Sequence, residues 1–276
     1  MGAEDEFQIL TRIPISGAKE EEMAEVFAPH DPDRCCLCGS AQDLTGEHKV
    51  KASTIRSLFS GEPMMIGTFD EGARPRRAQS SKSKAFHFQS RVCAACNSTR
   101  TQDADVEFAR FDEAARELLA QGADPATAFD DPRYALGSAP YLNVFRYLAK
   151  VLACHIAEVG GPRFTALVDF AIGRSDANPV SVRMGADGRF QFWFDHTGDP
   201  EFAGHGGLGA TFSKRTGLAN GFASSLTHGA LRYEFGISFN WMIGLLLRLQ
   251  HPTFHQRLAE VRRDALAAAD SASEAA

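Results

Sequence analysis

The chain has 276 residues, of which 44% are apolar, and a formal net charge of −6 with a pI near 5.9. This length allows one large domain or two modest ones, and the acidic balance does not by itself indicate a nucleic-acid-binding protein. The longest apolar run, residues 235–247, is too short and too polar to span a membrane, so we expect it to be buried in a core.

The N-terminal residues 1–30 are polar, with a short helical patch expected at residues 18–27. Residues 1–10 are acidic and lack the basic start and apolar run of an export signal, so we expect a cytoplasmic protein. In that reducing compartment, the six cysteines favour metal binding over disulfides.

A helix is expected at residues 103–122, after a region that holds two cysteine pairs. Its apolar residues recur at roughly helical spacing, and Gly122 is a plausible stop. These apolar residues are Val106, Phe111, Ala114 and Leu118. Proline, glycine and aspartate are frequent at residues 123–140, which predicts a boundary near residue 135.

The second half begins with a predicted buried helix at residues 141–161, followed by a shorter one at 163–173. The first helix is marked by Phe145, Leu148, Leu152 and Ile156 and ends at Gly160 and Gly161. A final helix is expected from about Thr253, and the alanine- and serine-rich end is expected to be a loose tail.

Between these helices, strict alternation of apolar residues predicts antiparallel strands. Strands are expected at residues 180–184 and 190–194, joined by a hairpin turn at 185–188, and again at 231–239. The alternating residues are Val180, Val182, Met184, Phe190, Phe192 and Phe194, then Leu231, Tyr233, Phe235, Ile237 and Phe239.

These elements predict an α+β fold with a small antiparallel sheet in its second half. The predicted parts are residues 1–30 (polar segment), 31–135 (the cysteine-bearing module with its trailing helix), 136–264 (an α+β recognition or oligomerisation domain) and 265–276 (a loose tail).

Two Cys-x-x-Cys pairs, Cys35 with Cys38 and Cys93 with Cys96, have the spacing of a tetrahedral four-thiolate zinc site. Gly39 suits the tight turn after the first pair because glycine tolerates positive φ. Cys36 is the spare cysteine, and Cys154, within the buried helix, is expected to be a core residue. The alternative is four unrelated core cysteines, which two such pairs in one chain disfavour.

Glu47 and His48 lie between the cysteine pairs, and Asn97 directly follows the last cysteine. This order resembles the zinc-bearing branch of the HNH endonucleases, the ββα-metal group, over about residues 35–105. The resemblance implies a β-hairpin carrying Glu47 and His48 and a following helix carrying Asn97. "EHKVKASTIRSLF" and "CNSTRTQDAD" also resemble an uncharacterised HNH-like group.

Phosphodiester hydrolysis needs a deprotonated water and a counter-charge for the phosphate. We expect Glu47 and Asn97 to hold a catalytic Mg²⁺ or Mn²⁺ ion, because such ions prefer oxygen ligands. We expect His48 to act as the general base, because an unperturbed histidine is largely neutral near pH 7. Neighbouring strand residues face opposite ways, so the pair needs a bent or bulged strand end.

Further residues are possible accessories to this site. Asp105 is expected to share a helix face with Asn97, where it would be an extra metal ligand or would orient one. The alternative is an ordinary aspartate at the start of a helix. Lys51 stands where the family often has proline. The middle Asn of the family is absent from residues 85–93, where His87 and Gln89 are the nearest polar substitutes.

Between residues 49 and 91 there are nine basic and only three acidic residues. Beside a phosphate-cutting site, such a stretch is expected to follow a nucleic-acid backbone without reading its sequence, and the alternative is a solvated loop. The expected backbone contacts are Lys51, Arg74, Arg76, Arg77, Lys82 and Lys84.

The leading interpretation is therefore a metal-dependent HNH-type endonuclease whose partner is nucleic acid, with DNA favoured, and no membrane. A double-strand break by one site per chain would suggest a homodimer. The first alternative is a zinc-stabilised nucleic-acid-binding protein with a degenerate site, and the second is an interaction protein with purely structural zinc. The second half carries no defensible catalytic motif and is predicted to recognise a target, a ligand or a subunit.

Overall fold

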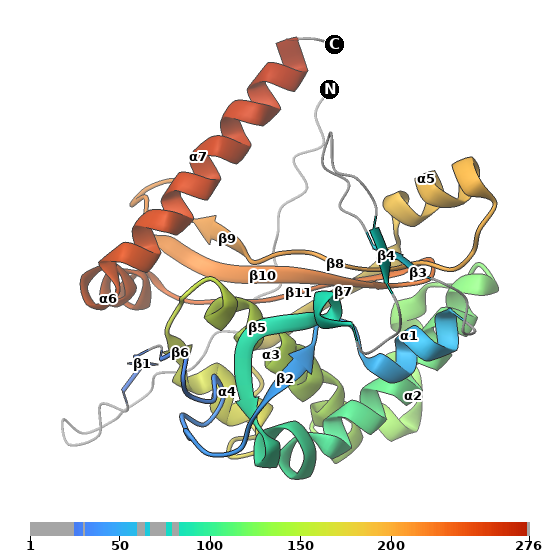
Figure 1. Cartoon of the computed structure of the whole chain (residues 1–276), viewed down its shortest axis with the longest axis horizontal. Helices are drawn as coiled ribbons and strands as arrows, with labels where there is room; N and C mark the ends of the chain where they lie inside the picture. The colour runs from blue at the N-terminus through green and yellow to red at the C-terminus, as the bar shows by residue number, and fades with distance from the viewer. Residues whose placement is uncertain (1–24, 30, 60–63, 67–75, 79–82, 275–276) are drawn as a thin grey trace.

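A computed structural model describes residues 25–29, 31–59, 64–66, 76–78 and 83–274. Helices mix with small antiparallel sheets along these ranges, in agreement with the predicted α+β class (Figure 1). None of the helices in these ranges combines the length and the apolar character needed to cross a membrane. The helical patch expected at residues 18–27 lies mostly outside the described residues, and Phe27 belongs to a strand.

In the first part of the chain, two antiparallel strands pair, and the second of them is followed by a helical turn. Its elements are β1 (Phe27–Ala28), β2 (Leu44–His48), α1 (Ala52–Leu58), β3 (Met64–Ile66), β4 (Arg76–Ala78), the 3₁₀ turn η1 (Lys84–Phe86), β5 (His87–Cys93), the π-helix η2 (Cys96–Arg100) and α2 (Gln102–Ala120). β2 pairs with β5 and β3 pairs with β4, both antiparallel. Both cysteine pairs therefore lie next to the β2–β5 ribbon.

The helix predicted at residues 103–122 is α2, and it stops before Gly122, whose φ of +76° suits glycine. Of the four apolar residues that predicted this helix, Phe111 is buried, but Val106 is 54% exposed. The buried face also includes Phe108 and two acidic residues, Glu107 and Asp112, that have buried partners. The spacing of apolar residues alone does not show that acidic residues lie on the buried face.

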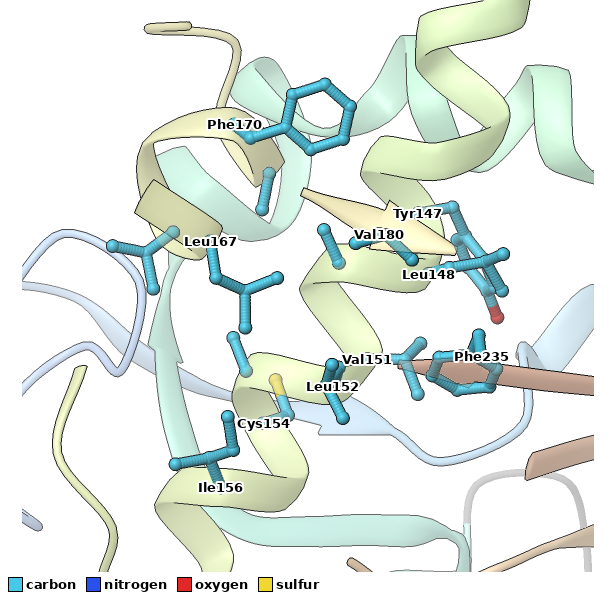
Figure 2. Packing of buried hydrophobic residues seen from close by; sticks show 14 of the residues in the cluster. Tyr147, Leu148, Val151, Leu152, Cys154, Ile156, Leu167, Phe170, Val180 and Phe235 are labelled. Carbon is cyan, nitrogen blue, oxygen red and sulfur yellow. The ribbon is translucent and has the colours of Figure 1, made fainter. Parts of the chain in front are cut away.

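The predicted buried helix is α3, and it lies at the centre of the molecule. The elements around it are the 3₁₀ turns η3 (Pro125–Asp130) and η4 (Pro132–Tyr134), α3 (Ala139–Glu158), β6 (Arg163–Phe164) and α4 (Thr165–Ala171). The hydroxyl of Ser138 caps α3 by accepting a hydrogen bond from the backbone of Tyr141. α3 packs against α2, α4, β5 and the main sheet, and its core side chains interlock with those of α4, β7 and β11 (Figure 2).

The main sheet has the strand order β7-β11-β10-β8, with β9 also paired to β10. Its strands are β7 (Val180–Ala186), β8 (Ala203–His205), β9 (Gly209–Phe212), β10 (Ala219–His228) and β11 (Leu231–Ser238). The strands predicted at residues 180–184 and 231–239 are therefore present. In β11 the alternating residues Leu231, Tyr233, Phe235 and Ile237 all face the core.

The strand predicted at residues 190–194 is wrong, because this segment is the helix α5 (Gly188–Thr197). Asp187 caps the helix by accepting a hydrogen bond from the backbone of Arg189, and Gly198 ends it with a φ of +69°. Phe190 and Phe194 then stack one turn apart on the helix surface. The capping residue Asp187 and the terminating Gly198 therefore determine the structure here, rather than the alternating phenylalanines. Residues 185–188 are not a hairpin turn.

Two helices, α6 (Trp241–Gln250) and α7 (Pro252–Glu274), complete the fold, and α7 extends away from the sheet (Figure 1). The apolar run at residues 235–247 is only partly buried as expected, since Trp241 on α6 is 59% exposed. The expectation of a loose tail at residues 265–276 is also wrong, because α7 continues through Glu274. Alanine has the highest helix propensity, which favours that continuation.

One hydrophobic cluster includes residues from both sides of position 135. It extends from Phe27 through Phe108 of α2 and Leu152 of α3 to Leu258 of α7. The boundary predicted near residue 135 therefore does not separate two hydrophobic cores.

Candidate functional site

The four cysteines of the two pairs converge on one point. Their sulfur atoms all lie within 4.8 Å of one another, and three of the four residues are buried. Cys93 ends β5 and Cys96 begins η2, while Cys35 and Cys38 lie in the loop before β2. Such a set could hold a metal ion such as zinc, because thiolates at this spacing suit tetrahedral coordination. Among the described residues, these cysteines form the only metal-binding group of three or more Cys, His, Asp or Glu side chains.

A tight backbone turn orients the first pair. The N–H of Gly39 donates to the carbonyl of Cys35 (2.8 Å), and Gly39 has the positive φ of 76° expected from the sequence. A Cβ at Gly39 would come within 2.5 Å of the guanidinium of Arg163, so the turn is also closely packed. A hydrogen bond from Cys96 is the largest influence on Cys35 and lowers the pKa of its thiol to about 4.

Cys36 is outside this cluster, as predicted. Its sulfur lies 3.7 Å from that of Cys154, and both side chains are buried. Cys154 is therefore a core residue of α3, as expected, and its neighbour is the spare cysteine.

Pairing between β2 and β5 is irregular at Glu47. Gly46 is opposite Arg91, but His48 is opposite His87, so the register shifts between Gly46 and His48. This irregularity matches the bent strand end that the Glu-His pair was expected to need. The side chain of Glu47 turns inward and is buried, whereas His48 is half-buried with its ring 3.9 Å from that of His87.

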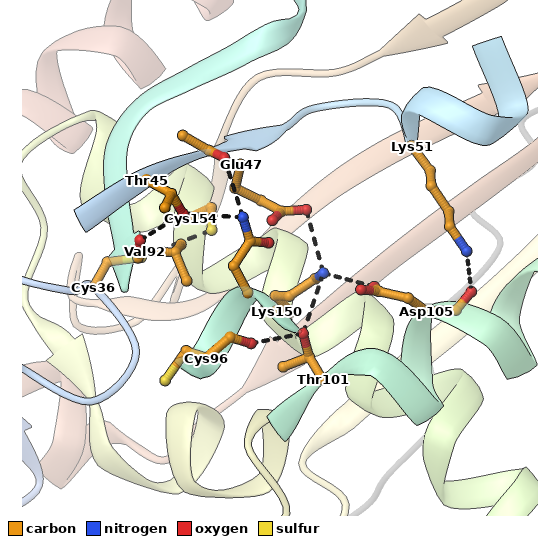
Figure 3. Close-up of polar contacts among 12 residues, drawn as sticks. Cys36, Thr45, Glu47, Lys51, Val92, Cys96, Thr101, Asp105, Lys150 and Cys154 are labelled. Atoms are coloured by element: carbon orange, nitrogen blue, oxygen red, sulfur yellow. Dashed lines mark hydrogen bonds and ion pairs between the residues drawn. The ribbon is translucent and has the colours of Figure 1, made fainter. Parts of the chain in front are cut away.

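The carboxylate of Glu47 meets a buried lysine from the second half of the chain. Lys150 Nζ, on α3, lies 3.2 Å from Glu47 Oε1 and 2.6 Å from Asp105 Oδ1 (Figure 3). It also approaches the hydroxyl of Thr101 at 3.5 Å. The Lys150 side chain is only 1% exposed. Burial lowers its pKa, but the attraction of Glu47 and Asp105 outweighs burial, so the net effect raises it.

Asn97 joins the helix to β2. Its side-chain nitrogen donates to Thr45 Oγ1 (3.1 Å) and to the carbonyl of Gly46 (3.2 Å). The Thr45 hydroxyl donates in turn to the carbonyl of Val92 in β5. The amide nitrogen of Asn97 therefore has a structural role, and its amide oxygen is the atom that could bind a metal ion.

The remaining predicted residues are spread over several surroundings. Asp105 lies in the first turn of α2, as expected for an aspartate at the start of a helix. It also contacts Lys150. His87 packs on His48, and its Nδ1 lies 3.1 Å from the carbonyl of Ser83. Gln89 is exposed, and its backbone N–H donates to Glu158.

The expected nucleic-acid backbone contacts are only partly described. Lys51 is half-buried and donates to the carbonyl of Asp105 (Figure 3), and burial lowers its pKa. Lys84 is exposed in η1. Arg74 and Lys82 lie outside the described residues, as do the side chains of Arg76 and Arg77 in β4.

Lys150 is the site residue that sequence reasoning missed. The available signal was a lysine in the middle of an otherwise apolar helix pattern, "YLAKVLACHIA". A lysine that is buried needs partners of opposite charge. That signal would have predicted a buried ion pair without showing which carboxylates complete it.

Comparisons with family models, with curated proteins and with solved structures find no match to this chain.

Proposed function

We propose that the chain is a metal-dependent, HNH-type endonuclease that hydrolyses phosphodiester bonds in nucleic acid, with DNA as the favoured substrate. The observation that supports this most is the joining of η2 and β2 next to the cysteine cluster. Asn97 reaches the carbonyl of Gly46 at 3.2 Å, so the helix after the last cysteine contacts β2 immediately before Glu47 and His48.

In this proposal, Cys35, Cys38, Cys93 and Cys96 hold a structural zinc ion. Buried thiolates whose sulfur atoms lie within 4.8 Å of one another fit that ion. Such a site contributes folding energy and holds the ends of β2 and β5 in place. The cysteines carry out no chemical step.

The oxygen atoms of Glu47 and Asn97 would hold a second, hard divalent ion such as Mg²⁺ or Mn²⁺. One carboxylate and one amide oxygen suit Mg²⁺, which usually keeps several waters and few protein ligands. When bound, the ion would supply positive charge to the phosphate and to the departing oxygen. His48 would accept the proton of the attacking water, and His87, packed on its ring, would restrict the orientation of His48.

A second candidate function rests on Lys150. Its ammonium lies against both Glu47 and Asp105 and balances one of their two negative charges, so less counter-charge is left for a metal ion to supply. This arrangement favours a zinc-stabilised nucleic-acid-binding protein that does not cut. The two candidates share the cysteine cluster and differ in the use of Glu47 and His48.

The test is nicking of supercoiled plasmid in Mg²⁺ or Mn²⁺ by the wild-type protein and by His48→Ala. We expect His48→Ala to lose about 100-fold or more in rate, the usual contribution of a general base. The matched control is His196→Ala, which removes a histidine exposed on α5 and should cut normally. Equal nicking by wild type and His48→Ala would contradict the mechanism. DNA binding without nicking in any metal would favour the second candidate.

A further inference from the structure

A cavity of about 960 Å³ lies on a part of the molecule that the proposed site does not use. Its walls come from the end of α3, from β5, from β9 with the residue before it, and from the first half of α7. Cavities of about 300–1,000 Å³ are typical of small-molecule sites. The size therefore suits a ligand rather than a few trapped waters.

Much of the cavity wall is apolar. Phe254 and Leu258 of α7 are buried beside it, and Val261, one turn further along, is 62% exposed. Leu208 and Ala210 also line the cavity and are half-buried. A ligand with an apolar body would cover Val261 and remove this surface from water.

Two arginines of α7, Arg257 and Arg262, also line the cavity. At 100° per residue, they lie on either side of the apolar stripe formed by Phe254, Leu258 and Val261. No described carboxylate forms an ion pair with either guanidinium. Arg262 rests over the ring of Phe212, at 4.9 Å from the ring centroid.

The carboxylates of the cavity already have cationic partners. Glu158 Oε1 lies 2.9 Å from the ammonium of Lys49, and Glu260 lies 4.0 Å from Arg263. Neither Lys49 nor Arg263 lines the cavity. The charge left to attract a ligand is therefore the positive charge of Arg257 and Arg262.

We propose that this cavity binds an organic anion with an apolar body. The body lies among Phe254, Leu258, Val261 and Leu208, and the anionic group is held by Arg257 or Arg262. Guanidinium groups suit this role, because their charge-assisted hydrogen bonds to carboxylate, sulfonate or phosphate oxygens are strong. This binding site is independent of nuclease activity.

The test uses two fluorescent probes of similar shape on the whole chain. Anilinonaphthalene sulfonate carries one negative charge on an apolar body, and N-phenylnaphthylamine is its neutral counterpart. We expect saturable binding of the sulfonate by wild type and about tenfold weaker binding by the double variant Arg257→Gln/Arg262→Gln, because the variant loses the charge-assisted hydrogen bond to the anionic group. Binding of the neutral probe should stay within about twofold, since the apolar wall is intact.

The matched control is Arg248→Gln, which removes an exposed arginine of α6 that does not line the cavity and should bind both probes as wild type does. Ala210→Trp, which fills the cavity, should weaken both probes. Circular dichroism and melting temperature check that each variant is folded, and the single Arg257→Gln and Arg262→Gln variants replace the double variant if it is not. The proposal is overturned if the sulfonate does not bind saturably, or if it binds the cavity-arginine variants and Arg248→Gln with equal affinity.

Discussion

Lys150, in the middle of α3, holds its ammonium 3.2 Å from the carboxylate of Glu47 in β2. The contact joins the cysteine-bearing part of the chain to the helix at the centre of the core. Because Lys150 is almost completely buried, both charges have lost most of their water. The surroundings of Glu47 are therefore determined as much by α3 as by the residues next to it in sequence.

Lys150→Met should destabilise the protein by about 3–5 kcal/mol, because it leaves the buried carboxylate of Glu47 without its cation. The measurement is urea unfolding at pH 7.5. The double variant Lys150→Met/Glu47→Gln should recover part of this loss, which gives a coupling free energy of at least about 1 kcal/mol. If the two single changes simply add, the contact between Lys150 and Glu47 contributes nothing to stability.

Purified protein should contain one zinc ion per chain, as measured by plasma mass spectrometry. Cys93→Ser should lose that zinc and about 4 kcal/mol or more of stability, since removal of a structural metal is among the most damaging single changes. Cys36→Ala is the control, because Cys36 lies outside the cluster and its loss should leave the zinc content unchanged. A zinc content far from one per chain would rule out a single four-thiolate ion.

Asn97→Ala should cost about 1–2 kcal/mol, because it removes the hydrogen bonds to Thr45 and Gly46. Asn97→Asp should cost more, since it puts a carboxylate oxygen against the carbonyl of Gly46 in place of a donor. Thermal unfolding at pH 7.5 measures both. Equal stability of the aspartate variant and wild type would mean that the amide nitrogen does not join the helix to β2.

His155, buried in α3, should make stability depend on pH. Burial, followed by the nearby His205 and Lys49, lowers its pKa to about 3. Between about pH 3 and 6.5 the unfolded chain therefore binds a proton that the folded chain does not, so stability falls as the pH drops. The loss from this residue is about 1.4 kcal/mol per pH unit in that window.

Urea unfolding of wild type and His155→Met at pH 7.5 and pH 5.5 tests this expectation. The methionine variant should lose less stability than wild type between the two pH values. His196→Met, which changes a histidine exposed on α5, should keep the wild-type dependence. Parallel pH curves for wild type and His155→Met would show that His155 is not the group responsible.

The cysteine cluster was predictable because the spacing within each pair is local and two such pairs together match one four-thiolate site. Two residues between cysteines fix how each pair can turn, and the structure brings all four sulfurs together. The helices α2, α3 and α4 and the strands β7 and β11 were also predictable from apolar periodicity. These features depend on neighbours in the sequence.

The wrong or missing predictions have two causes. In some segments an alternating pattern conflicted with helix-capping residues, and in others the interacting residue is distant in the sequence. The alternating phenylalanines from Phe190 to Phe194 resembled a strand, but Asp187 and Gly198 delimit a helix. The ion pair between Glu47 and Lys150 joins residues far apart in the chain, and no spacing rule relates them. The role of His48 in catalysis stays a prediction.

The π-helix η2 acts as a spacer of one residue between the cysteine cluster and α2. Its wider turn shifts the helical phase of the residues that follow it. Deleting one residue there would rotate α2 by about 100° and carry Asp105 away from Lys150, while Cys93 and Cys96 kept their positions. The alignment of the ion pair with the cysteine cluster is thus sensitive to the number of residues at this point of the chain, even when no side chain of the pair or of the cluster is replaced.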